Sequence, residues 1–151
     1  MSDRSPKGML LGGVPHAAAI GMQVLEVCNG QATAFAAYRD DLIGNPDTGV
    51  IHGGVITALL DNTCGIAVAA KSGMMGQIAT LDLRIDYMKP ATPGEAITSF
   101  AECYKITKNI AFVRGVAYHT NRDDPIATCT AAFMLGTKSQ ANANAVPKSS
   151  A

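Results

Sequence analysis

Hydrophobic residues recur at helical spacing in one long segment near the middle of the chain. After His52-Gly53-Gly54, apolar residues repeat every three to four positions until Lys71-Ser72-Gly73 closes the run: Val55, Ile56, Leu59, Leu60, Ile66 and Ala67. This spacing predicts one long α-helix. Because Asp61, Asn62 and three glycines interrupt the apolar stretch at residues 50–70, the pattern favours a buried helix over a membrane span.

Alternating polar and apolar residues predict six strands, two before this helix and four after it. Their approximate ranges are residues 20–28, 31–39, 79–88, 94–107, 109–120 and 125–136. The first two are joined by Asn29-Gly30, a strong two-residue signal for a tight hairpin. Residues 40–51 are rich in turn residues and predict a loop long enough to carry function. In the third strand, the phase places Thr80 on the polar face with Asp82 and Arg84.

The predicted order of elements is ββαββββ, which belongs to the α+β class. Short turns join the last strands, so those strands are expected to be antiparallel neighbours. One helix cannot cover both faces of a six-stranded sheet, so the sheet must curl round the helix or be covered by a partner. The 151 residues fit one domain, assigned to residues 16–137, between a loosely ordered segment at 1–15 and a disordered tail at 138–151.

Charge and cysteine usage narrow the classes of partner. Lys plus Arg equals Asp plus Glu at 12 each, and the pI is about 6.8, so we expect neither a nucleic acid nor an anionic membrane as partner. The four cysteines lie tens of residues apart without a CxxC pair, which indicates core thiols rather than a metal site. The apolar run before Gly12-Gly13 is too short for a signal peptide, so we expect a cytoplasmic protein.

Asp61 is a lone carboxylate on the predicted helix. On a helical wheel it points away from the core face, and its neighbours within about 60° are small or medium in size and uncharged: Thr57, Ala58, Cys64, Gly65 and Val68. A solvated helix face normally carries several charges, so this one indicates that another surface approaches closely. Asp61 is therefore a candidate catalytic group, and the alternative is a capped or partly exposed Asp with a structural hydrogen bond.

The start of the predicted helix offers a second candidate site. The first N–H groups of a helix lack internal partners and lie at the positive end of its dipole, so they can stabilise an oxyanion. Glycine at this position lets a substrate approach the backbone. We interpret His52 as a residue that bonds the backbone here rather than as a catalytic base. It precedes Asp61 by nine residues, about 13.5 Å along a helix, which is too far for a His–Asp dyad within one chain.

Two runs, NPDTGVIHGGVITALLDNTCG and TLDLRIDYMKPA, resemble the PaaI-type hotdog thioesterases, which hydrolyse acyl-CoA or aryl-CoA thioesters. The likeness covers roughly residues 16–137 and includes the order of elements. It implies a hotdog fold, in which a curved antiparallel sheet wraps one long helix and dimers join their sheets edge to edge. It implies no cofactor and no metal. A homodimer is the smallest assembly expected, with a homotetramer made of two dimers left open.

The resemblance also implies roles for individual residues. Gly53 would offer its N–H to the thioester carbonyl, and Asn45 in the preceding loop would help bind the substrate or water. Asp61 would act as nucleophile or general base, assisted by the hydroxyl of Thr80. The pair His52 and Gly54 completes the substrate-binding motif, with mainly structural roles.

The separation of Gly53 from Asp61 bears on where such a site lies. They are eight residues apart, about 12 Å along a helix, whereas an oxyanion donor and an attacking group must both lie near adjacent reacting atoms. If Gly53 and Asp61 both act in catalysis, one chain supplies Gly53 with Asn45 and the other chain supplies Asp61 with Thr80. The alternative is that either Gly53 or Asp61 has no catalytic role. Two other functions stay open, a non-catalytic acyl-CoA-binding hotdog module and a hotdog dehydratase.

Overall fold

A six-stranded antiparallel sheet packs on one long helix in the computed structural model, which describes residues 14–73 and 77–136. The elements are α3 (Gly53–Ser72) and strands β1 (Met22–Cys28), β2 (Gln31–Ala36), β5 (Ile78–Tyr87), β6 (Ile97–Ile106), β7 (Ile110–Tyr118) and β8 (Ala127–Leu135). Their order across the sheet is β1-β2-β6-β7-β8-β5, and every neighbouring pair is antiparallel. The α+β class and the order ββαββββ of the main elements are confirmed.

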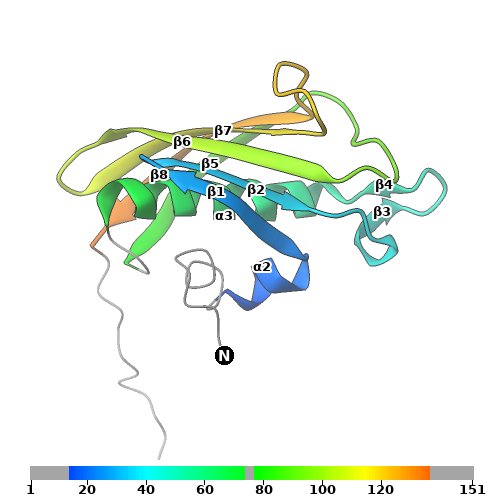
Figure 1. Cartoon of the computed structure of the whole chain (residues 1–151), viewed down its shortest axis with the longest axis horizontal. Helices are drawn as coiled ribbons and strands as arrows, with labels where there is room; N and C mark the ends of the chain where they lie inside the picture. Colours follow the sequence, from blue (N-terminus) through cyan, green and yellow to red (C-terminus); the bar gives the residue numbers. More distant parts are fainter. Residues whose placement is uncertain (1–13, 74–76, 137–151) are drawn as a thin grey trace, which may run out of the picture.

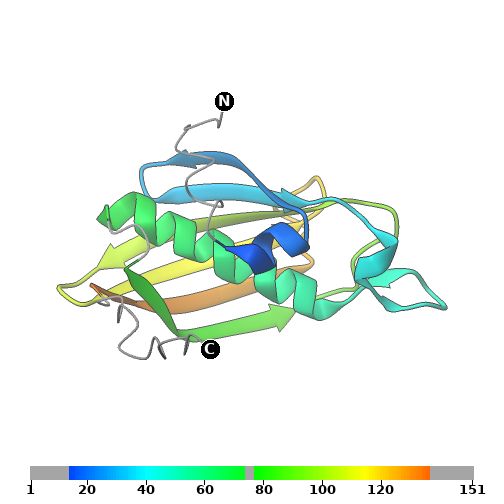
Figure 2. The same cartoon turned by 90° about the horizontal axis from the view of Figure 1, so that it is seen from below.

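Helix α3 lies against one face of the curved sheet, below it in Figure 1 and in front of it in Figure 2. Its buried residues are Val55, Ile56, Leu59, Leu60, Thr63, Cys64, Ile66, Ala67, Val68 and Ala69. The sheet contacts more of the helix than the predicted apolar face, so Cys64 and Val68, expected beside Asp61 on the open face, are fully buried. By length and composition alone α3 could cross a membrane, but its apolar residues are buried in the core against the sheet.

The hairpin between β1 and β2 turns at Asn29 and Gly30, as predicted. Their φ angles are 50° and 78°, so both residues are in the left-handed region that a type I′ turn requires. Asn and Gly reach this region at low cost, which explains why the sequence signal is reliable here.

Four short elements that the hydrophobic pattern does not predict surround the start of α3. Helix α2 (Pro15–Ala19) precedes β1, and the turn-rich segment before α3 contains η1 (Asp40–Leu42) and a small hairpin of β3 (Ile43–Asn45) and β4 (Val50–Ile51). Elements of two to five residues are too short to show a periodic pattern. The predicted tails fall mostly on residues 1–13 and 137–151, which lie outside the described part of the chain.

A β-bulge in β5 decides which face Thr80 occupies. The pairing with β8 shifts register between Thr80 and Asp82, which leaves Leu81 as an extra residue on β5. One extra residue reverses the alternation on its far side, so Thr80 and Leu83 both lie on the α3 side of the strand. The prediction that Thr80 shares a polar face with Asp82 and Arg84 is therefore wrong. The bulge is what directs Thr80 at the helix.

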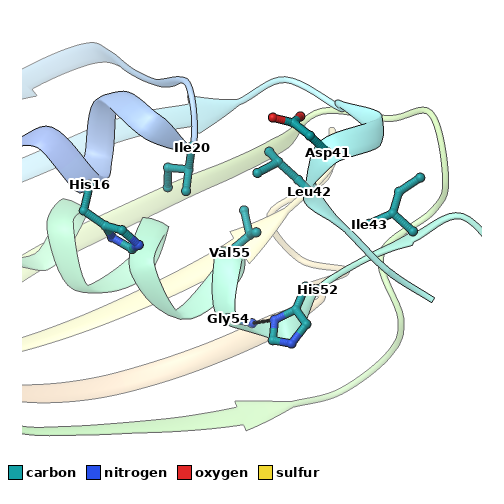
Figure 3. Close-up of a pocket in the computed structure, with 8 residues that line it drawn as sticks. All are labelled: His16, Ile20, Asp41, Leu42, Ile43, His52, Gly54 and Val55. Atoms are coloured by element: carbon teal, nitrogen blue, oxygen red, sulfur yellow. Dashed lines mark hydrogen bonds between the residues drawn. The ribbon is translucent and has the colours of Figure 1, made fainter. Parts of the chain in front are cut away.

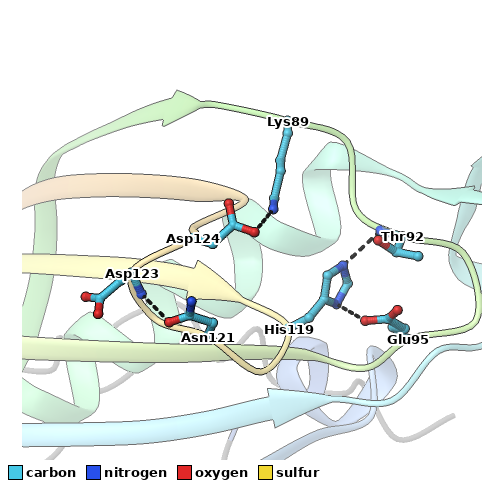
Figure 4. A network of polar contacts seen from close by, with 7 residues as sticks. All are labelled: Lys89, Thr92, Glu95, His119, Asn121, Asp123 and Asp124. Atoms are coloured by element: carbon cyan, nitrogen blue, oxygen red, sulfur yellow. Dashed lines mark hydrogen bonds and ion pairs between the residues drawn. The ribbon is translucent and has the colours of Figure 1, made fainter.

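His119 fixes the loop that leaves β5, residues 88–96 (Figure 4). The Thr92 N–H donates to His119 Nε2 at 2.8 Å, and Nδ1 lies 2.8 Å from the Ala96 carbonyl oxygen. Because Nε2 accepts, the neutral ring carries its proton on Nδ1 and donates it to that carbonyl. An ion pair between Lys89 and Asp124 ties the same loop to the turn between β7 and β8. Residues 88–91 are thereby held where they line a pocket at the start of α3.

Three of the four cysteines are buried, and the fourth is not. Cys64, Cys103 and Cys129 lie in the core as predicted, whereas Cys28 is exposed at the end of the edge strand β1. The Sγ atoms of Cys64 and Cys129 are 3.7 Å apart, and this contact together with burial raises the pKa of the Cys64 thiol. Both side chains pack between α3 and β8.

Candidate active site

Helix α3 begins with a cap made by the residue that precedes it. His52 has extended backbone angles, φ −58° and ψ 133°, and its Nδ1 accepts a hydrogen bond from the Gly54 N–H at 2.8 Å. A Cβ atom at position 54 would lie 2.8 Å from that same Nδ1, which is closer than side chains tolerate. With the His52 ring in this position, the cap therefore requires glycine at position 54.

This cap leaves the N–H of Gly53 without a partner. The Gly54 N–H bonds the His52 ring, and the Val55 N–H bonds the His52 carbonyl at 3.0 Å. Within residues 14–73 and 77–136, the Gly53 N–H donates no hydrogen bond. It stands at the positive end of a 20-residue helix. It is therefore the amide at this helix start that is available to bind a carbonyl oxygen or an oxyanion.

Tyr87, the last residue of β5, forms a hydrogen bond with the carbonyl group of Gly53. The Gly53 carbonyl oxygen accepts a hydrogen bond from the Tyr87 hydroxyl at 2.9 Å and from Thr57 Oγ1 at 3.2 Å. The two hydroxyl oxygens are 2.6 Å apart. Sequence reasoning missed this contact, because Tyr87 fits the alternation of its strand and no local spacing indicates that it reaches the helix start.

Asp61 lies half-buried with its carboxylate beside β5. Thr80 Oγ1 donates to Asp61 Oδ1 at 2.9 Å, a bond that depends on the bulge at Leu81. Among the described residues Oδ2 has no hydrogen-bond partner, so one carboxylate oxygen is oriented and the other is available. The neighbouring Ala58 and Gly65 are also half-buried, which leaves an open strip of small residues on this side of α3.

Two open pockets divide the candidate residues of one chain. The glycine pocket, about 400 Å³, contains Gly53 and Tyr87 and has apolar walls from Val50, Ile51, Ile56, Met88, Pro90 and Ala91. The carboxylate pocket, also about 400 Å³, contains Asp61 and Thr80 together with His16, Thr57, Ala58 and Leu83. Gly53 and Asp61 therefore face different spaces within one chain, in keeping with their separation of about 12 Å along the helix.

A third pocket, of about 430 Å³, lies between α2 and the start of α3 and is shown in Figure 3. His52 and His16 both line this histidine pocket, and His16 also lines the carboxylate pocket. In Figure 3 the His16 ring points from α2 toward α3. Sequence reasoning missed His16, because it precedes the first predicted strand. The proline at the first position of α2, followed by alanines, is the signal that could have found the helix.

Asn45 lies on the side of Gly53 and apart from Asp61. Its side-chain oxygen accepts from the Asp47 N–H at 3.0 Å, so it shapes the turn between β3 and β4. It pairs with Val50, which lines the glycine pocket, but Asn45 itself lines none of the three pockets. The structure thus brings Asp61 together with Thr80 and Gly54 in the carboxylate pocket, and joins Gly54 to His52 by a hydrogen bond. Gly53 and Asn45 do not line the pocket of Asp61.

Strand β5 connects these groups because it runs antiparallel to α3. Its Tyr87 end meets the start of the helix at Gly53, and its Thr80 end meets the helix about two turns later at Asp61. β5 is also an edge of the sheet, since it pairs only with β8 among the described strands. In Figure 2 its arrow lies at the border of the sheet, with the start of α3 near its tip.

Comparison with known proteins identifies the family. The family model of the Thioesterase superfamily matches residues 48–126, the segment that includes the helix start, Asp61 and Thr80. The chain belongs to this superfamily. It is a thioester hydrolase with the PaaI-type hotdog fold that its sequence predicts.

Individual relatives support this conclusion. A crystal structure of a Pseudomonas aeruginosa protein has 42% sequence identity and a TM-score of 0.76, covering 83% of this chain and 93% of that chain. The medium/long-chain acyl-CoA thioesterase YigI of Escherichia coli (strain K12) is 26% identical over 136 residues, 82% of this chain and 86% of YigI. The E. coli PaaI protein, at 17% identity and a TM-score of 0.73, covers 88% of this chain and 99% of its own and shares the fold.

The bond from Thr80 to Asp61 predicts a specific effect of two substitutions on thioester hydrolysis. Thr80→Val removes the donor to Oδ1, so kcat should fall about 10- to 100-fold, the effect of one lost hydrogen bond to a charged group. Thr80→Ser keeps the hydroxyl and should stay within a few-fold of wild type. Thiol release gives the rates, and thermal melting serves as the control for folding. Equal impairment of both variants, or a large drop in Tm, would assign Thr80 to packing instead.

Proposed function

We propose that this protein is an acyl-CoA thioesterase in which each active site is shared between two copies of the chain. The antiparallel course of β5 along α3 carries the proposal. If β5 pairs with the β5 of a second copy about a two-fold axis, the Thr80 end of one strand lies beside the Tyr87 end of the other. Asp61 of one protomer then approaches Gly53 of its partner, which resolves their separation within one chain.

The free edge of β5 supports pairing at this position. A ten-residue strand bonded on one side presents a row of unpaired backbone groups, which soluble proteins normally cover. Large apolar side chains accompany this edge: Leu81 and Tyr87 are each 51% exposed, and Met88 is 56% exposed. Joining two such edges would extend the sheet and cover part of this surface.

The charges along β5 favour one register for such a pair. Asp82, Arg84 and Asp86 alternate in sign at every second position. An axis at Leu83 would set Asp82 of each strand opposite Arg84 of the other, whereas an axis at Arg84 would set Asp82 opposite Asp86. Opposite charges facing each other across strands are stabilising and like charges are not, so we propose the axis at Leu83.

Each group in the shared site has a role in thioester hydrolysis. The Gly53 N–H binds the thioester carbonyl and stabilises the negative charge that develops on its oxygen. Asp61 of the other chain attacks the carbonyl carbon or removes a proton from the water that attacks it. The C–S bond then breaks, the thiolate leaves and takes up a proton, and water supplies the oxygen of the acid. Thr80 orients Asp61, and Asn45, whose strand partner Val50 lines the glycine pocket, helps to bind the substrate or water.

The substrate class follows from the relatives and the walls of the glycine pocket. YigI, which this chain matches over most of both lengths, is named as an acyl-CoA thioesterase for medium and long chains. The apolar residues that flank Gly53 suit an acyl group beside the reacting carbonyl. Four free cysteines fit a reducing compartment, so we place the protein in the cytoplasm. A homodimer completes both sites, and a homotetramer of two such dimers would preserve them.

Asp61→Asn should reduce turnover of acyl-CoA by about 10²- to 10⁴-fold, because the amide is nearly isosteric but is neither nucleophile nor base. The rate of thiol release from a series of acyl-CoA esters measures this, and binding of a non-hydrolysable thioether analogue should be unchanged. Asp123→Asn, in the distant β7–β8 turn, is the matched control and should keep wild-type activity. Turnover of the Asp61 variant within a few-fold of wild type would remove Asp61 from the mechanism.

Subunit mixing tests the shared site, with Gly53→Pro as the second lesion. Proline removes the N–H, it is favoured at the first helical position, and the extended backbone of His52 suits a following proline. If Gly53→Pro and Asp61→Asn are each inactive, an equal mixture that has exchanged subunits should recover about a quarter of wild-type activity, since half the dimers contain one intact site.

This test has a control variant and a result that would contradict the shared site. Gly53→Ala keeps the N–H, and its Cβ would lie 3.6 Å from the Tyr87 ring, an ordinary contact, so it should fold like wild type and lose less activity than Gly53→Pro. A mixture that stays inactive after exchange has been verified by mass would place all catalytic groups within one chain.

Leu81→Asp should separate the protomers, because it puts a charge on the edge that is proposed to pair. Leu25→Asp is the matched control, as Leu25 is 46% exposed on β1 at the opposite edge of the sheet. Sedimentation should give a monomer without activity for the first variant and an active dimer for the second. An active dimer from Leu81→Asp would exclude pairing through β5.

A further inference from the structure

The peptide group between Gly53 and Gly54 is held from both sides by side chains. Its N–H donates to His52 Nδ1 at 2.8 Å, and its carbonyl oxygen accepts from the Tyr87 hydroxyl at 2.9 Å. Thr57 adds a contact of 3.2 Å to the same oxygen and lies 2.6 Å from the Tyr87 hydroxyl. The result is a continuous chain of hydrogen bonds from β5 through the first turn of α3 to the His52 ring.

Two consecutive glycines need such restraints if one of their amides is to act as a fixed donor. Without a Cβ, the φ and ψ angles of Gly53 and Gly54 are less confined than those of other residues. A donor stabilises a developing oxyanion best when its direction is already set, because no free energy is then spent on orienting it during the reaction. The Gly53 N–H belongs to the preceding peptide group, between His52 and Gly53. The φ and ψ angles of Gly53 link the two peptide groups, so holding the Gly53–Gly54 peptide also restricts the direction of the Gly53 N–H.

Packing within one chain does not account for the position of Tyr87. Its side chain is 51% exposed at the end of an edge strand, and it is not part of the buried core. Its ring passes the place where a Gly53 side chain would begin, with ring atoms 3.6–3.8 Å from an ideal Cβ there. The described contacts of its hydroxyl group are all to the first turn of α3.

We propose that Tyr87, supported by Thr57, is a positioning residue that fixes the direction of the Gly53 N–H for catalysis. This rests on the proposed function, in which that N–H binds the thioester carbonyl. Tyr87 acts through Gly53, while its ring forms part of the wall of the glycine pocket. The contact links the end of β5 directly to the oxyanion donor.

Because two hydroxyl groups can donate to the Gly53 carbonyl, removing one should reduce activity less than removing both. Either hydroxyl can donate to the Gly53 carbonyl, because Thr57 Oγ1 is also within hydrogen-bond distance of it. Tyr87→Phe therefore leaves one donor, and Thr57→Val leaves the other. Loss of both leaves the carbonyl without a side-chain donor among the described residues. The double variant should lose more activity than the two single effects predict by addition, since each residue substitutes for the other.

The kinetic test compares Tyr87→Phe, Thr57→Val and the double variant. We expect kcat to fall about 10-fold for Tyr87→Phe and about 10²-fold for the double variant, approaching the loss caused by removing one oxyanion donor. KM and Tm should change little, and Thr57→Ser should restore most of the activity lost in Thr57→Val. Tyr104→Phe is the matched control, because Tyr104 is 52% exposed on β6 and should tolerate the change.

A vibrational measurement distinguishes a role of Tyr87 in positioning the Gly53 N–H from a role in stabilising the fold. An acyl-CoA with a ¹³C-labelled thioester carbonyl is bound to three proteins that all carry Asp61→Asn, so that turnover is slow: one with no other change, one with Gly53→Pro and one with Tyr87→Phe. A hydrogen bond lowers the carbonyl stretching frequency. We expect the lowest frequency in the first protein, the highest with Gly53→Pro, and an intermediate, broader band with Tyr87→Phe.

The outcomes distinguish this inference from the proposed function. If Gly53→Pro leaves the frequency unchanged, Gly53 does not bind the carbonyl, and both proposals fail. If Gly53→Pro raises the frequency while Tyr87→Phe leaves both frequency and kcat unchanged, the Gly53 assignment stands and the role of Tyr87 is overturned. A loss of kcat in Tyr87→Phe accompanied by a matching fall in Tm, with the frequency unchanged, would also overturn it.

Discussion

The site depends on how the first amide groups of α3 are satisfied. A helix start leaves N–H groups without internal partners, and here the His52 ring takes one and the His52 carbonyl takes another. The Gly53 N–H remains available at the positive end of the helix. The same cap excludes any side chain at position 54, because a Cβ would collide with the ring. Capping and substrate binding thus share the residues His52, Gly53 and Gly54.

Strand β5 supplies the second constraint, because it contacts α3 at two functionally different points. Its bulge at Leu81 turns Thr80 toward Asp61, while its last residue, Tyr87, reaches the start of the helix. The strand is also the unpaired edge of the sheet. One element therefore orients the carboxylate, holds the glycine backbone and offers the surface on which a second copy can pair. A change in β5 would affect all three at once.

Several site features could be read from the sequence because they depend on local spacing. The helical period and the Gly pair at its start place Gly53 and Asp61 on one helix, and their separation follows from the rise per residue. The lone charge among small neighbours identifies Asp61. Other features could not be read, because they arise from contacts across more than 20 residues. Tyr87 meets Gly53 from 34 positions away, and His16 reaches the pocket of Asp61 from a helix before the first strand.

By itself, the sequence determined the α+β class, the order of the main elements, the Asn29-Gly30 hairpin and the family, since periodicity, turn chemistry and motif spacing are properties of short segments. The tertiary structure decided which faces are buried and where side chains point. Cys64 and Val68 are buried because the sheet curls further round α3 than a helical wheel indicates. Thr80 faces Asp61 because one extra residue in the pairing with β8 reverses the alternation of β5, and that register is set by the neighbouring strand rather than by the sequence of β5 itself.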